Sequence, residues 1–412
     1  MMKIFSIAVT VTAILSSGYG SSNNQSKQGI TKAFFGDKEL NRVVIANIDE
    51  MEYSKPEYDA FTEHEITYAV DKVPNNPKAY ISNRGSNAID IINTESNKII
   101  KTINTVHYPR SADAMNTSNH LAEVSGMNKA MASIIDIKTD KIVAVVGPNV
   151  EKDPENQPEK GGSHATGHPY WLNDTNFIIN DRYNKKIVMY RMQNKEAIEV
   201  NEVETLTSVH QLIPRKGYQG PDHIYYAVEE GSNTEYPSII KLKLTDAGLK
   251  LIDRVFLKKE GVNVLDMKGH HGDFHPSQKL IYVGSDEGNL FMVNYETMQI
   301  IKTVQAGRGA GHTFMSLEKG IAIVINHSDV FVSIIDLDTN RKITDTKVSN
   351  ADDLIGKKTL QAHPEYYISD NKFYMALTEE GKIIELDLNI YEVTKSVDFG
   401  GKITMGAFVE GH

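Results

Sequence analysis

The chain of 412 residues contains no cysteine and a single tryptophan. Without cysteine there is no disulfide, no thiolate zinc site, no iron–sulfur cluster and no cysteine nucleophile. Any metal must therefore be held by histidine, carboxylate or backbone oxygen. An excess of positive charge is also missing, because the formal net charge is −10, and this argues against binding to nucleic acid or to an anionic membrane surface. Histidine, in contrast, is well represented, with 14 residues.

Long hydrophobic runs are scarce, and the one near the N-terminus is short. An apolar run of 12 residues, 4–15, follows Lys3 and precedes the small residues of 16–20. Twelve residues are too few to span a bilayer as a helix, and the pattern is typical of a signal peptide, which we assign to residues 1–20. We therefore expect a periplasmic or secreted protein with no membrane insertion after cleavage. Residues 21–40, rich in Ser, Asn, Gln and Lys, are expected to form a flexible segment.

A repeated strand pattern fills the rest of the chain, and we assign residues 41–412 to a single β-propeller domain. In each copy a β-branched and aromatic run precedes a polar turn, and a second strand ends in Asp or Asn before a tight turn and a third strand. Short strands repeating every 40–60 residues predict an all-β, seven-bladed propeller, because one four-stranded sheet cannot bury its faces alone. The copies lie at residues 80–103, 133–146, 177–203, 224–257, 281–304, 322–346 and 373–397.

Two further strand-like pieces, 42–50 and 402–410, lie outside these copies. We expect them to pair and close the ring, and an eight-bladed ring built partly from both ends is the alternative. The segments YISNRGSNAIDIINTESNKIIKTI (80–103) and VFVSIIDLDTNRKI (330–343) resemble the YVTN-type repeat of seven-bladed propellers. The resemblance covers residues 64–398 and implies the fold, but it implies little about function, because propellers host many chemistries.

Histidines recur where the innermost strand of each blade is expected to begin, at intervals of 41–61 residues. The starts of inner strands gather at one mouth of the central channel, so these imidazoles should share one volume, where zinc or copper would suit them. Asp113, Asp273 and Glu65 are candidate partners that would fix the ring tautomers. The predicted metal ligands are His64, His107, His164, His168, His210, His270, His271, His312 and His363. The histidines expected at the surface or in packing roles are His120, His223, His327 and His412, and of these His327 is expected in a turn between strands from which it could approach the mouth less directly.

Two narrower resemblances point to different functions. The stretch HHGDFHPSQKLIYVGSDEGNL (270–290) is similar to a segment of periplasmic zinc chaperones. That resemblance implies zinc delivery, with a metal ABC transporter or its solute-binding protein as partner. The adjacent pair His270-His271 and the stretch GAGHTF (309–314) resemble the propeller of nitrous oxide reductase, which implies copper. This chain lacks the cysteine-bearing electron-transfer domain of that family, so a reductase of this kind would need an external electron donor.

The sequence therefore favours an exported propeller that binds zinc or copper and serves in metal delivery or homeostasis. A copper-dependent periplasmic oxidoreductase and a protein-interaction propeller without metal are the alternatives, and no catalytic residue is assigned. A lactonase-type hydrolase is less favoured, because such metal sites use Glu, Asn and Asp. Arg110, in HYPRSAD (107–113), is placed near the mouth. It is expected either to bind an anionic ligand or to pair with a carboxylate.

Overall fold

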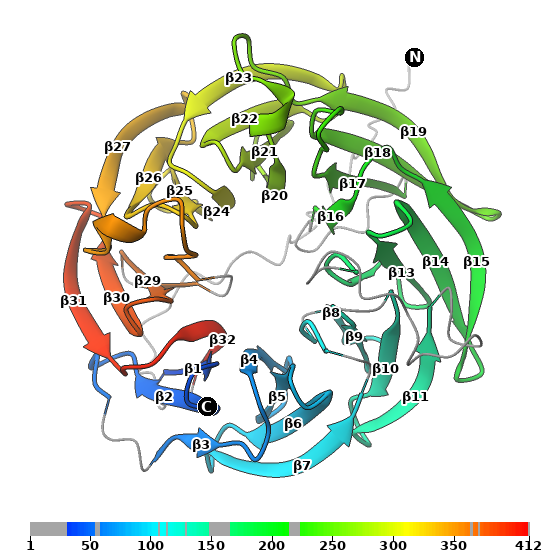
Figure 1. The fold of residues 1–412 in the computed structure, drawn as a ribbon, viewed down its shortest axis with the longest axis vertical. Helices are drawn as coiled ribbons and strands as arrows, with labels where there is room; N and C mark the ends of the chain where they lie inside the picture. Colours follow the sequence, from blue (N-terminus) through cyan, green and yellow to red (C-terminus); the bar gives the residue numbers. More distant parts are fainter. Residues whose placement is uncertain are drawn as a thin grey trace, which may run out of the picture.

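A computed structural model shows eight four-stranded antiparallel sheets arranged around a central axis (Figure 1). It describes residues 31–410 apart from 54–57, 106–107, 113, 128–129, 148–164, 214–222, 363–365 and 370. The molecule is an eight-bladed β-propeller, so the principal prediction of seven blades was wrong and the eight-bladed alternative is confirmed. The expected signal peptide, 1–20, lies outside the described residues. Within the described part of the chain, no helix is long and apolar enough to cross a membrane.

The strands of each blade follow one another from the axis outward, except in the blade that joins both ends of the chain. That blade contains β32 (Ile403–Val409), β1 (Lys32–Asp37), β2 (Arg42–Asn47) and β3 (Ala60–Phe61) from the axis outward. The next blade contains β4 (Thr67–Lys72), β5 (Lys78–Asn83), β6 (Ala88–Asn93) and β7 (Lys98–Asn104). The third contains β8 (Ala114–Asn116), β9 (Leu121–Ser125), β10 (Ala132–Asp136) and β11 (Lys141–Val146). The fourth contains β12 (Tyr170–Trp171), β13 (Asn176–Asp181), β14 (Lys186–Gln193) and β15 (Glu196–Glu204).

The second half of the ring repeats this order. The fifth blade contains β16 (Val209–Leu212), β17 (Ile224–Glu229), β18 (Ser238–Thr245) and β19 (Gly248–Phe256). The sixth contains β20 (Gly269–Phe274), β21 (Leu280–Ser285), β22 (Asn289–Asn294) and β23 (Gln299–Gln305). The seventh contains β24 (Ala310–Ser316), β25 (Ile321–Asn326), β26 (Phe331–Asp336) and β27 (Arg341–Lys347). The eighth contains β28 (Tyr367–Ser369), β29 (Lys372–Leu377), β30 (Lys382–Asp387) and β31 (Glu392–Asp398). Two short 3₁₀ helices, Val264–Asp266 and Asp352–Leu354, lie between blades.

The acidic or amide residue that ends the third strand of several blades explains the tight turn that follows. The Asp136 carboxylate accepts hydrogen bonds from the backbone N–H groups of Lys138 and Thr139. Asp336 accepts one from Thr339 in the same way. Such side-chain bonds replace a backbone turn and favour Asp and Asn at this place. The sequence pattern of a strand that ends in Asp or Asn therefore marks the turn between the third and fourth strands of a blade.

The hydrophobic core lies between neighbouring blades. One buried cluster, for example, combines Ile178 and Met189 of the fourth blade with Ala227 and Ile240 of the fifth. Another joins the sixth and seventh blades. Each sheet thus buries both faces only because another sheet packs on either side. The side chains that point away from these interfaces, at the axis, are left to form a site.

The ring is closed by a strand from the far end of the chain. β32 pairs with β1, which pairs in turn with β2. The two pieces 42–50 and 402–410 close the ring in one blade as expected, but the predicted direct pairing between them was wrong, because β1 lies between β2 and β32. β1 also corrects the expected flexible segment 21–40, because Lys32–Asp37 is a strand with five of six residues buried. The strand was not predicted because the apolar residues Ala33, Phe34 and Phe35 follow a long polar stretch.

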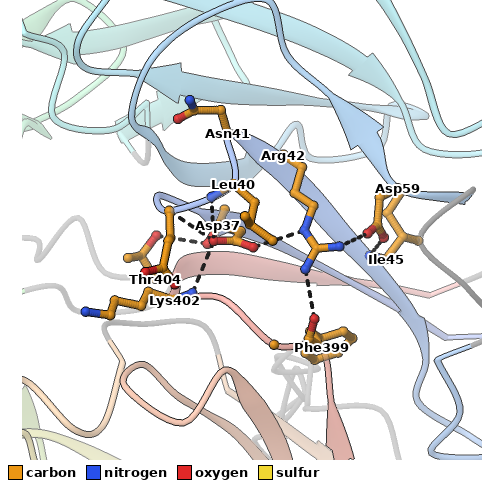
Figure 2. A network of polar contacts seen from close by, with 12 residues as sticks. Asp37, Leu40, Asn41, Arg42, Ile45, Asp59, Phe399, Lys402 and Thr404 are labelled. Carbon is orange, nitrogen blue, oxygen red and sulfur yellow. Dashed lines mark hydrogen bonds and ion pairs between the residues drawn. The ribbon is translucent and has the colours of Figure 1, made fainter.

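A buried arginine stabilises this closure, as Figure 2 shows. The Arg42 guanidinium forms ion pairs with Asp37 at 3.0 Å and Asp59 at 2.8 Å, and it donates to the backbone oxygen of Phe399 at 2.8 Å. The backbone N–H of Lys402 donates to Asp37 at 3.1 Å. One cation therefore connects the first described strands with the segment that leads into β32.

Candidate metal centre

The starts of the innermost strands and the turns between the second and third strands meet at one mouth of the central channel. In an antiparallel meander, the start of the innermost strand lies on the same face as the turn between the second and third strands. A pocket of about 420 Å³ opens there. Its lining residues, drawn from both kinds of position, are Lys38, Tyr68, Arg84, Arg110, Met127, His168, Arg182, His210, Glu230, Lys268, Gly269, His270, Asp286, Thr359, Thr378, Thr404 and Met405.

Bulges at the starts of the inner strands direct side chains into this pocket. The register of β16 against β17 shifts between Val209 and Gln211, which leaves His210 as the extra residue. The registers of β20 and β24 shift across His270-His271 and across Gly311-His312. A bulge disrupts the ladder locally and re-aims its side chains, and such bulges are common next to functional sites. The sequence supplies histidine at each of these three bulges.

The bulge in β20 brings the adjacent histidines together. Strict alternation along a strand would place His270 and His271 on opposite faces. In the structure both rings belong to one cluster, with centroids 4.1 Å apart. Two residues of β20 stand opposite one of β21 at this point, so the alternation is broken.

Six imidazoles from four consecutive blades form the cluster, which we call the histidine cluster. Its members are His168, His210, His270, His271, His312 and His327. The ring of His210 lies 4.6 Å from that of His271 and 4.8 Å from that of His270. His271 stacks on His312 at 3.7 Å, and His168 lies 5.4 Å from His271. Five of these six were among the predicted ligands.

His327 is the member that was not among the predicted ligands, because it was assigned a surface or packing role with only a less direct approach to the mouth. It follows β25, in the turn between the second and third strands of its blade, and its ring lies 5.0 Å from that of His270. That turn is on the same face as the starts of the inner strands, so the strand pattern contained the signal. Gly311 leaves the room that the ring needs, because a Cβ there would collide with the His327 imidazole and crowd Nδ1 of His270.

Hydrogen bonds to Nδ1 orient three of these rings. His327 donates from Nδ1 to the backbone oxygen of Gln361 at 2.9 Å, and His210 donates to Oε1 of Glu230 at 2.6 Å. Nδ1 of His271 is hydrogen-bonded to Oε1 of Gln211. An oxygen acceptor on Nδ1 places the proton there and leaves a lone pair on Nε2, which is the usual arrangement for a metal-binding histidine. The buried Nε2 of His210 has no hydrogen-bond partner among the described residues.

Burial keeps these imidazoles in the form that binds metal. It lowers the pKa of His210, His270 and His312 well below the ordinary value, and neighbouring histidines lower it further. Burial also lowers the pKa of His327 to about 4, although the hydrogen bond to Gln361 opposes this. At neutral pH the four rings are therefore neutral, and each keeps a lone pair.

Two groups of three histidines have ligand nitrogens within 4.8 Å of one another in the described part of the chain. One is His168, His210 and His271, and the other is His270, His271 and His327. Around a tetrahedral zinc the nitrogens lie about 3.3 Å apart, so small rotations of the rings would bring either group to bonding distance. Neutral imidazole suits zinc and copper alike. The donor set therefore fits a transition metal, with His271 common to both groups.

His168 differs from the others because its Nε2 lies 2.9 Å from Nη2 of Arg110. A guanidinium only donates, so this Nε2 accepts the hydrogen bond and its lone pair is engaged. The group of His270, His271 and His327 is consequently the better candidate for the metal site. Arg110, buried except for 7% of its surface, thus lies directly beside the histidine cluster.

The remaining predicted ligands do not join the cluster or cannot be placed. Nε2 of His64 lies 3.3 Å from Oδ1 of Asp90, and among the described residues its ring makes no contact with the histidine cluster. Asp273 lies 3.9 Å from Nδ1 of His312, as expected for a partner, whereas Glu65 is exposed. His120 lies in a turn and His223 is exposed, in line with their expected roles. The predicted positions outside the described residues are His107, Asp113, His164, His363 and His412.

Comparisons with known proteins show the fold. The sequence matches no protein-family model and no curated protein. Apo AztD from Citrobacter koseri is similar at 11% identity over 93% of this chain and 99% of its own, with a TM-score of 0.65. The dihydro-heme d1 dehydrogenase NirN in complex with DHE is similar at 11% identity over 97% and 79%, with the same TM-score. BamB from Moraxella catarrhalis is similar at 10% identity over 82% and 89%, with a TM-score of 0.56. At such identities these structures establish the chain as a β-propeller.

Proposed function

We propose that the histidine cluster binds a transition metal, zinc or copper, and that the protein serves in metal delivery or homeostasis outside the cytoplasm. The observation that carries the proposal is that hydrogen bonds orient His210, His271 and His327 for metal binding. Each has Nδ1 hydrogen-bonded to an oxygen, and each belongs to a group whose ligand nitrogens lie within 4.8 Å. Neutral rings have no hydrophobic reason to gather in this way, and a metal would satisfy their lone pairs.

Delivery is favoured over catalysis because the candidate ligands are numerous and buried. A catalytic metal keeps an open position, whereas a site with more than three candidate imidazoles offers a closed shell. The partner in this proposal is a metal ABC transporter or its solute-binding protein, in the periplasm. This part of the proposal derives from the resemblance of residues 270–290 to zinc chaperones.

The test is elemental analysis of the untagged protein purified from the periplasm, with an absorption spectrum and a zinc competition titration. One zinc per chain without colour would support delivery. Several coppers per chain with visible bands would favour the oxidoreductase alternative and direct the search to an electron donor. Failure to bind either metal after reconstitution would leave an interaction propeller and overturn the proposal.

A further inference from the structure

The mouth of the channel has a second half, which carries cations in place of histidines. Arg84 lies in the turn between β5 and β6, and Tyr68 is the extra residue of a bulge in β4. The guanidinium carbon of Arg84 lies 3.0 Å from the centroid of the Tyr68 ring. Nη2 of Arg84 donates to the backbone oxygen of Arg110 at 3.4 Å. Both arginines line the pocket and are more than nine-tenths buried.

Arg84 has no carboxylate within ion-pair distance among the residues that the structure describes. A buried charge is costly unless it is paired, so a guanidinium in this state needs an anion from elsewhere. Its Nε is also buried without a hydrogen-bond partner. The pKa of Tyr68 shows the effect of the positive charge around it. Burial alone would raise this pKa, but Arg84, Lys38 and Arg110 lower it overall.

The pocket as a whole is cationic, although the protein is acidic. The lining carries five cationic side chains, Lys38, Arg84, Arg110, Arg182 and Lys268, against two carboxylates, Glu230 and Asp286. Arg182 is paired with Glu230. Burial raises the pKa of Asp286 to about 6, so this carboxylate is largely ionised at neutral pH, but the cations of the lining still outnumber the carboxylates. With a net charge of −10 on the chain, positive charge has been concentrated at this mouth.

We propose that this half of the pocket binds a small polycarboxylate, with its carboxylates on Arg84 and Arg110. The arginine fork matches a carboxylate in two-point fashion. A pocket of about 420 Å³ is larger than a single inorganic oxyanion requires, and the arginines come from different blades, so an extended anion with several charged groups fits best. Through Arg110 and His168 the anion would lie beside the histidine cluster. If the proposed metal function holds, such an anion would offset the charge of the metal.

The experiment is isothermal titration of the metal-stripped full chain with citrate, and separately with inorganic phosphate, in a zwitterionic buffer at low salt. Citrate should bind, and Arg84→Gln should weaken that binding at least tenfold. Lys38→Gln, at the less buried edge of the pocket, should weaken it about threefold and covers the case in which Arg84→Gln does not fold. Arg191→Gln removes the same charge from β14, where Arg191 contacts Asn176 away from the pocket, and should leave citrate binding unchanged.

Three outcomes would overturn the proposal: no binding of citrate, equal citrate binding by Arg84→Gln and the wild type, or phosphate binding as tight as that of citrate. The last would indicate a simple oxyanion site. Zinc and copper binding by the wild type, each titrated without citrate, tests the metal function separately. Citrate binding without binding of either metal would therefore refute the proposed function alone, and metal binding without citrate binding would refute only the anion site.

Discussion

The imidazole rings of His271 and His312 are stacked, with centroids 3.7 Å apart and planes inclined by 22°. Two imidazolium ions could not stack so closely without strong repulsion, so this arrangement depends on neutral rings. The stack comes from two bulged inner strands of neighbouring blades. It makes the apo state of the histidine cluster sensitive to acid.

The stability of the metal-free protein should fall as pH decreases from about 6.5 toward 4. The pKa values of His210, His270, His312 and His327 are lower in the folded protein than in the unfolded chain. The unfolded chain therefore takes up protons first, and each histidine should remove about 1.4 kcal/mol per pH unit in this window. Asp286, whose pKa is raised to about 6, opposes this by one proton.

Urea unfolding of the apo protein at pH 7.5, 6.5, 5.5 and 4.5 measures this dependence. His312→Asn should make the profile shallower by about one histidine, because Asn does not titrate in this range. A stability that stays constant across the four pH values would show that the cluster is not buried and neutral as described.

Metal retention should depend on the cluster and not on histidines elsewhere. His271→Ala should reduce zinc affinity most, because His271 belongs to both candidate groups. His312→Ala should reduce it as well, because the His312 ring stacks on that of His271. His64→Ala and His120→Ala are the matched controls, since His64 pairs with Asp90 and His120 lies in a turn. Competition with a zinc chelator measures each affinity. Equal retention in all four variants would refute the site.

Glu230 should support metal binding without touching the metal. Its Oε1 accepts the hydrogen bond from Nδ1 of His210, and partners of this kind are worth about 10–100-fold in metal affinity. Glu230→Gln is therefore expected to weaken zinc binding by that factor. Glu202→Gln removes an equivalent charge from a surface pair with Lys186 and should have no effect. The same zinc competition titration measures both variants. A zinc affinity of Glu230→Gln equal to that of the wild type would show that His210 is not a ligand.

Arg42 should be essential to ring closure. Arg42→Met leaves the buried Asp37 and Asp59 without their cation, and loss of one partner of a buried ion pair costs about 3–5 kcal/mol. Lys342→Met, which breaks an exposed pair with Asp345, should cost under about 1 kcal/mol. Chemical denaturation followed by circular dichroism compares the two. Similar small losses in both variants would mean that the closure does not depend on Arg42.

The repeated strand pattern was enough to predict a propeller, because period-two strands and Asp-capped turns are local features. The number of blades, in contrast, depends on pairing between segments that are far apart in the sequence. The blade that joins both ends of the chain takes its inner strand from 403–409 and its second strand from 32–37, and no single segment shows the whole repeat. Residues 32–37 were assigned to a flexible segment because polar residues precede them.

For the site, the rule that inner strands begin at one mouth correctly brought His168, His210, His271 and His312 together. It failed for His64, whose neighbour Asp90 provides a local partner. It also left His327 out of the ligand set, because turns between strands were given less weight than strand starts at the same mouth. The bulge that joins the rings of His270 and His271 depends on pairing with β21, which alternation along one strand does not reveal.

The pocket includes Thr404 and Met405, and both belong to β32, the last described strand. During synthesis the other seven blades can therefore assemble while the mouth is still incomplete. Only when β32 takes its place between β1 and the axis does the pocket acquire its full wall. In the proposed function, ligand binding would therefore require a completed ring.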